Sequence, residues 1–368
     1  MRTAGDNAPA LRRACAALPE DLRSGAEFLI ANMPAVDLAQ MPESTLVANV
    51  RLAYHAWRSF PWARQIPEEV FLHYVLPYRV TQEPISDWRA MFLDSLTPVV
   101  GKCTSMTQAA LEVNKWCGAR VKYKPNAPRD QGPLQTLKSS WGRCEEMMIV
   151  HIDACRAVGI PAREAYTPYW PMTESNHAWS EAWIDGKWYY MGACEPAPIL
   201  NNAWFDKTVQ RAALVMNVSF GVPHSETSFY RKEANAAVIN STMNYTQTGI
   251  LSVRVFGSRG DSPYFPRRKN GTVPSPEKGA SVVISVFNFG SLRPIARLVT
   301  DKDGAASIAI GPGDYFVSTG AARRHVEEVV HIESNSVKEV RFDLTPHSAI
   351  RIPQSAPLRF WLWYKAVE

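Results

Sequence analysis

The stretch from Trp141 to Arg163 constrains the fold of this chain more than any other part of it. Cys144 opens a segment in which apolar residues recur at steps of three and four, so one face of a helix is buried. Gly159 followed by Ile160-Pro161 ends this helix, because Gly accepts the left-handed cap and Pro cannot continue the helix. Gly142, just ahead of the cysteine, allows a tight turn. The sequence therefore predicts a buried helix that begins at Cys144.

A cysteine at the start of a helix is a candidate nucleophile. It lies among unpaired backbone N–H groups at the positive end of the helix dipole, and both features favour the thiolate over the thiol. A catalyst of this kind also needs an imidazole within hydrogen-bond reach and usually a third group that orients the ring. His177 lies 33 positions after Cys144, at the mouth of a strand expected over residues 178–183. A helix packed on a sheet can bring the two side chains together.

The six cysteines favour reduced thiols over a metal site. They form no CxxC pair and show no zinc-ligand spacing. Cys144 and Cys155 lie eleven positions apart on one helix, about 16 Å at ~1.5 Å per residue, far beyond the ~7 Å that a disulfide spans. We therefore expect no metal and no cofactor. His151, in the middle of the apolar helix face, is expected to be a core histidine with satisfied hydrogen bonds.

Composition excludes several classes of function. The 368 residues are enough for two or three domains, and the apolar share of 46% supports real cores. No run approaches the ~18–20 apolar residues of a membrane helix. The net charge of +5 is small and scattered, so no nucleic-acid surface is indicated. As written the chain shows no signal peptide and is expected to be cytoplasmic, or periplasmic or secreted if Met1 replaced a removed signal.

The order of patterns along the chain predicts an α+β fold with appended domains. Helical spacing dominates the first part, a helix followed by antiparallel strand patterns forms the second, and seven short strand patterns separated by turn signals indicate a β-sandwich. The expected segments are a helical region at 1–96, the core at 97–220, a linker at 221–244, the β-sandwich at 245–345, and a tail at 346–368 that packs back onto a domain.

The sequence around the two candidate residues is more specific than their spacing. Three segments resemble the transglutaminase-like superfamily over roughly residues 105–215: Gly142-Arg143-Cys144, Arg156–Arg163, and Asn176-His177-Ala178-Trp179 followed by Gly186-Lys187-Trp188. The resemblance implies a papain/transglutaminase-like core in which Cys144 and His177 are catalytic. Further segments are similar to a bacterial branch of transglutaminase-domain proteins, namely Tyr166-Thr167-Pro168, Gly192–Pro196 and Ala203-Trp204-Phe205. That branch has a helical N-terminal region and a C-terminal sandwich of carboxypeptidase-regulatory type.

The chain departs from the family's pattern at the third catalytic residue. The family usually has an Asp on the strand after the histidine, and Gly192 stands at that place. Glu195 is the nearest carboxylate that can reach back to the imidazole, and Asn176 and Glu181 are alternatives. Such an orienting group contributes a large factor in rate, so its loss leaves room for a weakened activity.

The oxyanion of the reaction needs hydrogen-bond donors. The backbone N–H of Cys144 is one. The resemblance suggests an upstream side chain as the second, with Trp116 and Trp141 as candidates, and Asn176 is a further candidate for substrate contact. Each tryptophan has an alternative interpretation as a core aromatic.

The expected activity is acyl transfer at an amide or peptide carbonyl through a thioester acyl-enzyme. Hydrolysis by a peptidase or amidase is slightly favoured over transfer to an amine acceptor, which is the transglutaminase outcome. The expected partner is a peptide or amide substrate, with no nucleic acid and no membrane, and the oligomeric state stays open. The alternative is a catalytically weakened module that binds a peptide or glycan.

Overall fold

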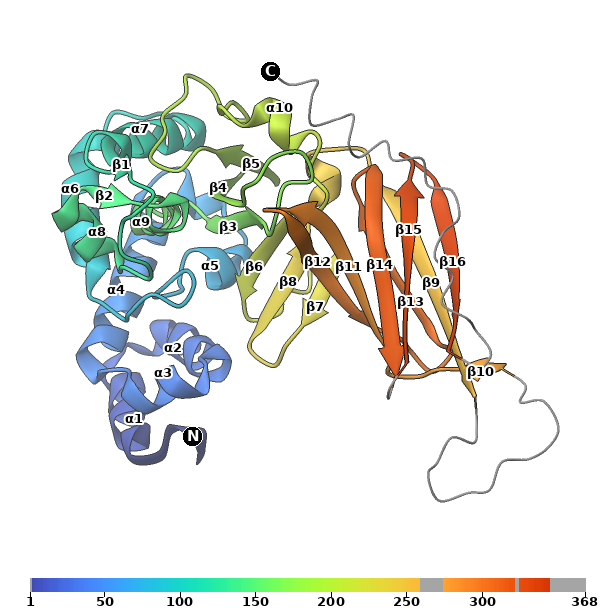
Figure 1. Cartoon of the computed structure of the whole chain (residues 1–368). Helices are drawn as coiled ribbons and strands as arrows, with labels where there is room; N and C mark the ends of the chain where they lie inside the picture. The colour runs from blue at the N-terminus through green and yellow to red at the C-terminus, as the bar shows by residue number, and fades with distance from the viewer. Residues whose placement is uncertain (1, 259–273, 322–323, 345–368) are drawn as a thin grey trace. The chain divides into compact units, whose positions relative to one another are not determined.

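The computed structural model describes residues 2–258, 274–321 and 324–344, which fall into two compact units (Figure 1). The first unit comprises Met1–Pro168 and Asn176–Tyr245. The second comprises Tyr169–Ser175 and the described residues from Thr246 onward. The loop Tyr169–Ser175 therefore groups with the second unit although it connects two strands of the first. The expected C-terminal tail, 346–368, lies outside the described residues.

The first hundred residues form helices, and prolines mark where several of them start. Pro19, Pro34, Pro42 and Pro67 each stand directly before a helix, where a missing N–H costs nothing. The helices are α1 (Ala8–Ala17), α2 (Glu20–Asn32), α3 (Ala35–Gln40), α4 (Glu43–Ser59), α5 (Glu68–Tyr74) and α6 (Trp88–Val100), with 3-10 turns at Arg2–Asn7 and Ala63–Gln65. The helical character expected for this region is confirmed.

The rest of the first unit is a helix packed on an antiparallel sheet, as expected. After α7 (Met106–Gly118) and α8 (Pro133–Ser139), the central helix α9 spans Cys144–Ala157. It packs against the strands β3 (Ala162–Thr167) and β4 (His177–Ile184), and also against α6, α7 and α8 (Figure 1). Since every residue from Glu146 to Ala157 is buried, α9 is the centre of the unit rather than a surface helix.

The sheet has six strands in the order β5-β4-β3-β6-β8-β7, and all its neighbours are antiparallel. Besides β3 and β4 it contains β5 (Lys187–Met191), β6 (Met216–Phe220), β7 (Phe229–Lys232) and β8 (Ala236–Asn240). The short helix α10 (Asp206–Val209) follows β5, and a separate parallel pair joins β1 (Lys122–Tyr123) to β2 (Trp141–Gly142). The 3-10 turn Thr242–Asn244 closes the unit.

Residues 221–244 are not the linker that the sequence analysis expected. They carry β7 and β8, and β8 pairs along its whole length with β6. The pairing was missed because it depends on long-range partners: the five residues Ala236–Asn240 are too short a pattern to indicate a strand by themselves, and they form one by pairing with β6.

The exit from α9 explains why arginines flank Gly159. Gly159 adopts a φ of 72°, the left-handed cap that the sequence predicts. The guanidinium of Arg156 donates to the carbonyls of Tyr74, Arg79 and Ala162. Arg163 forms a buried ion pair with Glu181 at 2.7 Å between Nε and Oε2. Both arginines therefore hold the fold together rather than face a substrate.

The described residues of the second unit form two four-stranded sheets. One joins β10 (Pro274–Pro276), β13 (Ala305–Ile310) and β16 (Val337–Asp343) to β9 (Gly249–Ser258), with β16 parallel to β9. The other has the antiparallel order β12-β11-β14-β15, formed by Ser291–Val299, Ser281–Asn288, Gly313–Ala321 and Arg324–Ile332. Alternate residues such as Val282, Ile284 and Val286 are buried, which is the period-two pattern of a sheet with one core face. All seven strands predicted here are present.

Candidate active site

Cys144 is the first residue of α9, and a capping box holds the start of that helix. The backbone N–H of Arg143 donates to Glu146 over 3.1 Å, and the Arg143 guanidinium donates to the same carboxylate over 2.8 Å. Gly142 is required by close approach rather than by a turn, because a Cβ there would lie 2.9 Å from the Cβ of Glu146. The nucleophile candidate therefore sits on a rigid helix start.

The sulfur of Cys144 faces the beginning of β4. Backbone N–H groups of Ala178 and Glu145 donate to it and lower the pKa of the thiol, as does the charge of Arg143. Burial is the largest influence, and it raises the pKa of Cys144 above its ordinary value. Desolvation thus outweighs the effect of the helix start on the pKa, and Cys144 is a protonated thiol near neutral pH. Since Ala178 directly follows His177, the sulfur of Cys144 lies beside the start of the strand that His177 begins.

His177 is the first residue of β4 and lies opposite Thr167 of β3. Its imidazole is enclosed by three aromatic rings: Trp179 is stacked at 5.7 Å between centroids, Trp204 meets it edge-on at 5.0 Å, and Phe205 does so at 4.8 Å. Burial lowers the pKa of His177 to about 4, so the imidazole is neutral at pH 7. A neutral imidazole is the form that accepts a proton from a thiol.

Glu195 fills the space beside Gly192. A Cβ on Gly192 would lie 2.8 Å from Oε2 of Glu195, so the carboxylate occupies the place where a side chain at position 192 would begin. The turn that allows this includes Cys194 at a φ of 57°, and the carbonyl of Gly192 accepts from Asn114 over 2.9 Å. Burial raises the pKa of Glu195, and a hydrogen bond from the indole N–H of Trp204 lowers it. The carboxylate of Glu195 thus lies where the side chain of the family's Asp would begin at position 192.

The other predicted residues differ in their surroundings. Trp116 is buried in α7 against Phe92 and under the guanidinium of Arg120, as a core aromatic is. Trp141 is 45% exposed, three residues before Cys144, with the Lys124 amine over its ring. Of the two oxyanion or substrate candidates, Trp141 is therefore the one at the surface. Asn176 stands directly before β4.

Glu181, an alternative orienting residue, is already bound in a buried network. Besides the ion pair with Arg163, its carboxylate accepts from Asn217 and from the hydroxyl of Tyr245. The same hydroxyl accepts from the indole N–H of Trp179, the ring stacked on His177. Glu181 thus supports the wall of the site rather than the imidazole itself.

His151 is a core histidine, as predicted. Its Nδ1 lies 2.6 Å from the Ser180 hydroxyl, and burial lowers its pKa to about 3. Cys155 is buried beside its other ring nitrogen.

The aromatic wall formed by Trp179, Trp204 and Phe205 was not assigned a role from the sequence. From the sequence, Trp204 and Phe205 were noted only as part of a segment that resembles a family. Their signal is an aromatic pair in a loop after β5, and nothing in a linear pattern places that loop over His177.

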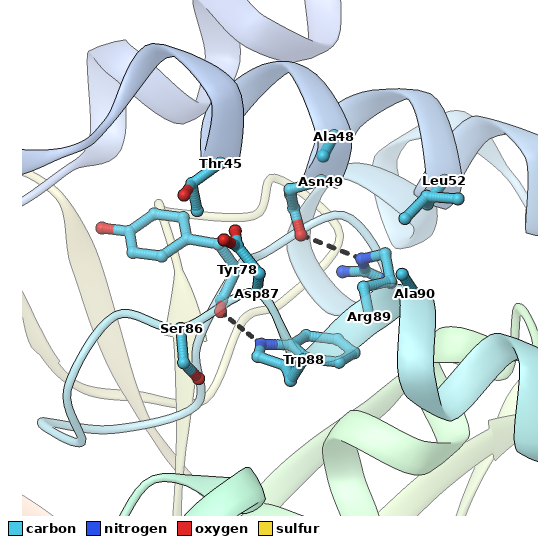
Figure 2. A pocket seen from close by; sticks show the side chains of 10 residues that line it. All are labelled: Thr45, Ala48, Asn49, Leu52, Tyr78, Ser86, Asp87, Trp88, Arg89 and Ala90. Atoms are coloured by element: carbon cyan, nitrogen blue, oxygen red, sulfur yellow. Dashed lines mark hydrogen bonds between the residues drawn. The ribbon is translucent and has the colours of Figure 1, made fainter.

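No candidate metal site is found in the described part of the chain, since no three His, Cys, Asp or Glu side chains gather there as ligands. Among the same residues, none of the helices combines the length and apolarity that a membrane crossing requires. A small hollow lies instead in the helical region, lined by residues of α4 and α6 and the segment before α6 (Figure 2). Figure 2 shows two hydrogen bonds across it, from Arg89 to Asn49 and from Trp88 to the carbonyl of Tyr78. It contains none of the candidate catalytic residues.

Comparison with known proteins identifies the central part of the chain. A family described as the transglutaminase-like superfamily matches residues 94–193. Comparison with curated proteins returned no match.

Solved structures offer remote likenesses. A proposed cysteine protease from Cytophaga hutchinsonii is 13% identical, with a TM-score of 0.32 over 77% of this chain and 62% of that one. A proposed protease from Parabacteroides distasonis is 13% identical, with a TM-score of 0.28 over 78% and 52%. Red sea bream transglutaminase is 9% identical, with a TM-score of 0.31 over 74% and 65%. The chain spans less than two thirds of each of these three.

Proposed function

Because residues 94–193 form a transglutaminase-like domain, we propose that this protein is a cysteine-dependent enzyme that forms a thioester with the acyl group of an amide or peptide. One observation supports the proposal: the backbone N–H of Ala178 donates to the sulfur of Cys144, and Ala178 directly follows His177, the first residue of β4. A Cys–His catalyst needs its thiol and its imidazole within hydrogen-bond reach of each other. Here the two residues stand at the start of α9 and at the start of β4.

In the proposed reaction, both residues start neutral. As the sulfur of Cys144 attacks the carbonyl carbon, its proton passes to His177, and the carbonyl oxygen becomes an oxyanion near the backbone N–H groups at the start of α9. The C–N bond then breaks, and the imidazolium gives its proton to the leaving amine. Glu195 stabilises the positive imidazole between these steps. The product of this half-reaction is a thioester on Cys144.

The second half-reaction releases the acyl group. Water or an amine attacks the thioester, His177 takes the proton from the attacking group, and the sulfur leaves and regains a proton. We favour water as the acceptor because Trp204 and Trp141, one against His177 and one just before Cys144, are 67% and 45% exposed. Side chains so open to solvent do not shield a thioester from hydrolysis.

The test is acylation of Cys144 by an activated amide, a peptide p-nitroanilide, followed by intact mass in the wild type, Cys144→Ala and His177→Ala. We expect an acyl adduct on Cys144 in the wild type, none in Cys144→Ala, and a loss of about 10²–10⁴-fold in rate without the imidazole. Adding glycinamide to the same reaction measures how the thioester divides between water and an amine. Equal p-nitroaniline release by all three proteins would overturn the proposal.

The binding-module alternative has one observation in its favour. Burial raises the pKa of Cys144 and lowers that of His177, so the resting pair carries no ion pair. A module that had lost catalysis would bind the peptide with the same affinity in the wild type and in Cys144→Ala, and would release no product. Calorimetric titration of both proteins with the same peptide separates this case from the enzyme.

A further inference from the structure

Trp204 contacts two of the three proposed catalytic residues. Its indole N–H donates to Oε2 of Glu195 over 2.8 Å, and its ring meets the imidazole of His177 at 5.0 Å between centroids with the planes 60° apart. The residue is nevertheless 67% exposed, whereas tryptophan is highly buried on average. The next residue, Phe205, packs against the same imidazole and is fully buried.

The backbone around Trp204 is held in place independently of its ring. The carboxylate of Asp206 accepts from the backbone N–H of Ala203 over 2.8 Å and from the hydroxyl of Tyr190 on β5 over 2.9 Å. An indole that is two-thirds exposed gains little from burial, so packing alone does not explain its placement. What fixes the ring on this anchored turn is its hydrogen bond to Glu195 and its edge contacts with His177 and Phe205.

Glu195 needs such a partner. A glutamate has three rotatable side-chain bonds, and holding its carboxylate at the place beside Gly192 costs conformational entropy. A hydrogen bond from an N–H group to a carboxylate is among the stronger ones and also favours the ionised form. The ionised form is the one that can stabilise an imidazolium.

We propose that Trp204 is a positioning residue that links Glu195 to His177. Its N–H holds the carboxylate beside Gly192, and its ring holds the imidazole. The distance and orientation between the carboxylate and the imidazole therefore stay fixed while the proton moves. This inference rests on the function proposed above and assigns Trp204 a role in it. It acts through Glu195 and does not itself exchange a proton.

The experiment is a double-mutant cycle on the p-nitroanilide reaction with Trp204→Phe, Glu195→Ala and the double variant. Trp204→Phe keeps an aromatic ring but removes the donor, and we expect kcat to fall about tenfold, the effect of one hydrogen bond to a charged group, with KM changed less than twofold. If Trp204 acts through Glu195, the double variant loses no more than Glu195→Ala alone. Trp183→Phe, half-buried near the other end of β4, is the matched control and is expected to keep the wild-type kcat.

Each outcome has a separate meaning. If the wild type fails to acylate Cys144 in a His177-dependent way, the proposed function fails, and the role of Trp204 in it fails as well. If the wild type reacts but the two single losses multiply in the double variant, Trp204 and Glu195 act independently and the link is wrong. A Trp204→Phe loss that appears in KM alone would make Trp204 a substrate contact and would also overturn the inference.

Discussion

The backbone N–H of Ala178 is directed at the sulfur of Cys144, so the start of β4 and the start of α9 meet at one atom. The relationship depends on α9 packing directly on β3 and β4. It also sets the chemistry, because the same burial that brings the elements together raises the pKa of the thiol and lowers that of the neighbouring imidazole.

Glu145→Gln is expected to make Cys144 more reactive. The charge of Glu145 raises the pKa of the thiol, so its removal increases the thiolate fraction below that pKa. We expect iodoacetamide to label Cys144 about two- to fivefold faster at pH 7.5, measured by intact mass. Glu68→Gln, on α5, is the control and is expected to label at the wild-type rate. An unchanged or slower rate in Glu145→Gln would contradict the electrostatic account.

Gly142→Ala is expected to destabilise the start of α9. The added carbon would lie 2.9 Å from the Cβ of Glu146 and 3.3 Å from the backbone nitrogen of Met147, both held by the helix. Overpacking of this kind costs about 1–3 kcal/mol, measured by urea unfolding, and it moves Cys144. Gly132→Ala, whose added carbon meets nothing closer than 3.6 Å, should cost less. Equal losses in the two variants would show that the contact at Gly142 does not matter.

Arg163→Met is expected to be among the most destabilising single changes in the first unit. The side chains of Arg163 and Glu181 are 1% and 2% exposed, and removing one partner leaves a buried charge, which costs about 3–5 kcal/mol. The comparison is Arg13→Met, which breaks a pair with Glu43 at the same 2.7 Å but with 63% and 37% exposure. That surface pair should contribute about 0.2–1 kcal/mol in urea unfolding. Similar losses in both would refute the argument from burial.

Stability is expected to fall as the pH drops below about 6.5, in part because of His151. Burial lowers its pKa to about 3, whereas an unfolded histidine titrates near ~6.5. Between these values the unfolded chain binds a proton that the folded protein excludes, so His151 removes up to about 1.4 kcal/mol of stability per pH unit as the pH falls. In His151→Gln the decline between pH 6.5 and 4 should be shallower, measured by urea unfolding at several pH values. An identical slope in the two proteins would show that His151 takes up its proton in the folded state.

Local patterns determined many of the elements, though not β6 to β8, and the two central residues. The spacing of apolar residues, Gly159 and Pro161 delimit α9, and alternation with turn signals delimits β3 to β5 and the strands of the second unit. These features could be predicted because helix and strand periodicities, caps and turns depend on residues close in sequence. The motifs around Cys144 and His177 then indicated the transglutaminase-like superfamily, which the match over 94–193 confirms.

Only the tertiary structure decided the environment of the site. Burial of Cys144 and His177, and with it the direction of both pKa values, depends on what packs over them from distant segments. The place of Glu195 beside Gly192 depends on a turn held by Asn114 of α7, and its partner Trp204 comes from a loop nine residues further on. Desolvation and long-range hydrogen bonds are properties of the folded arrangement, so no local pattern in the chain carries them.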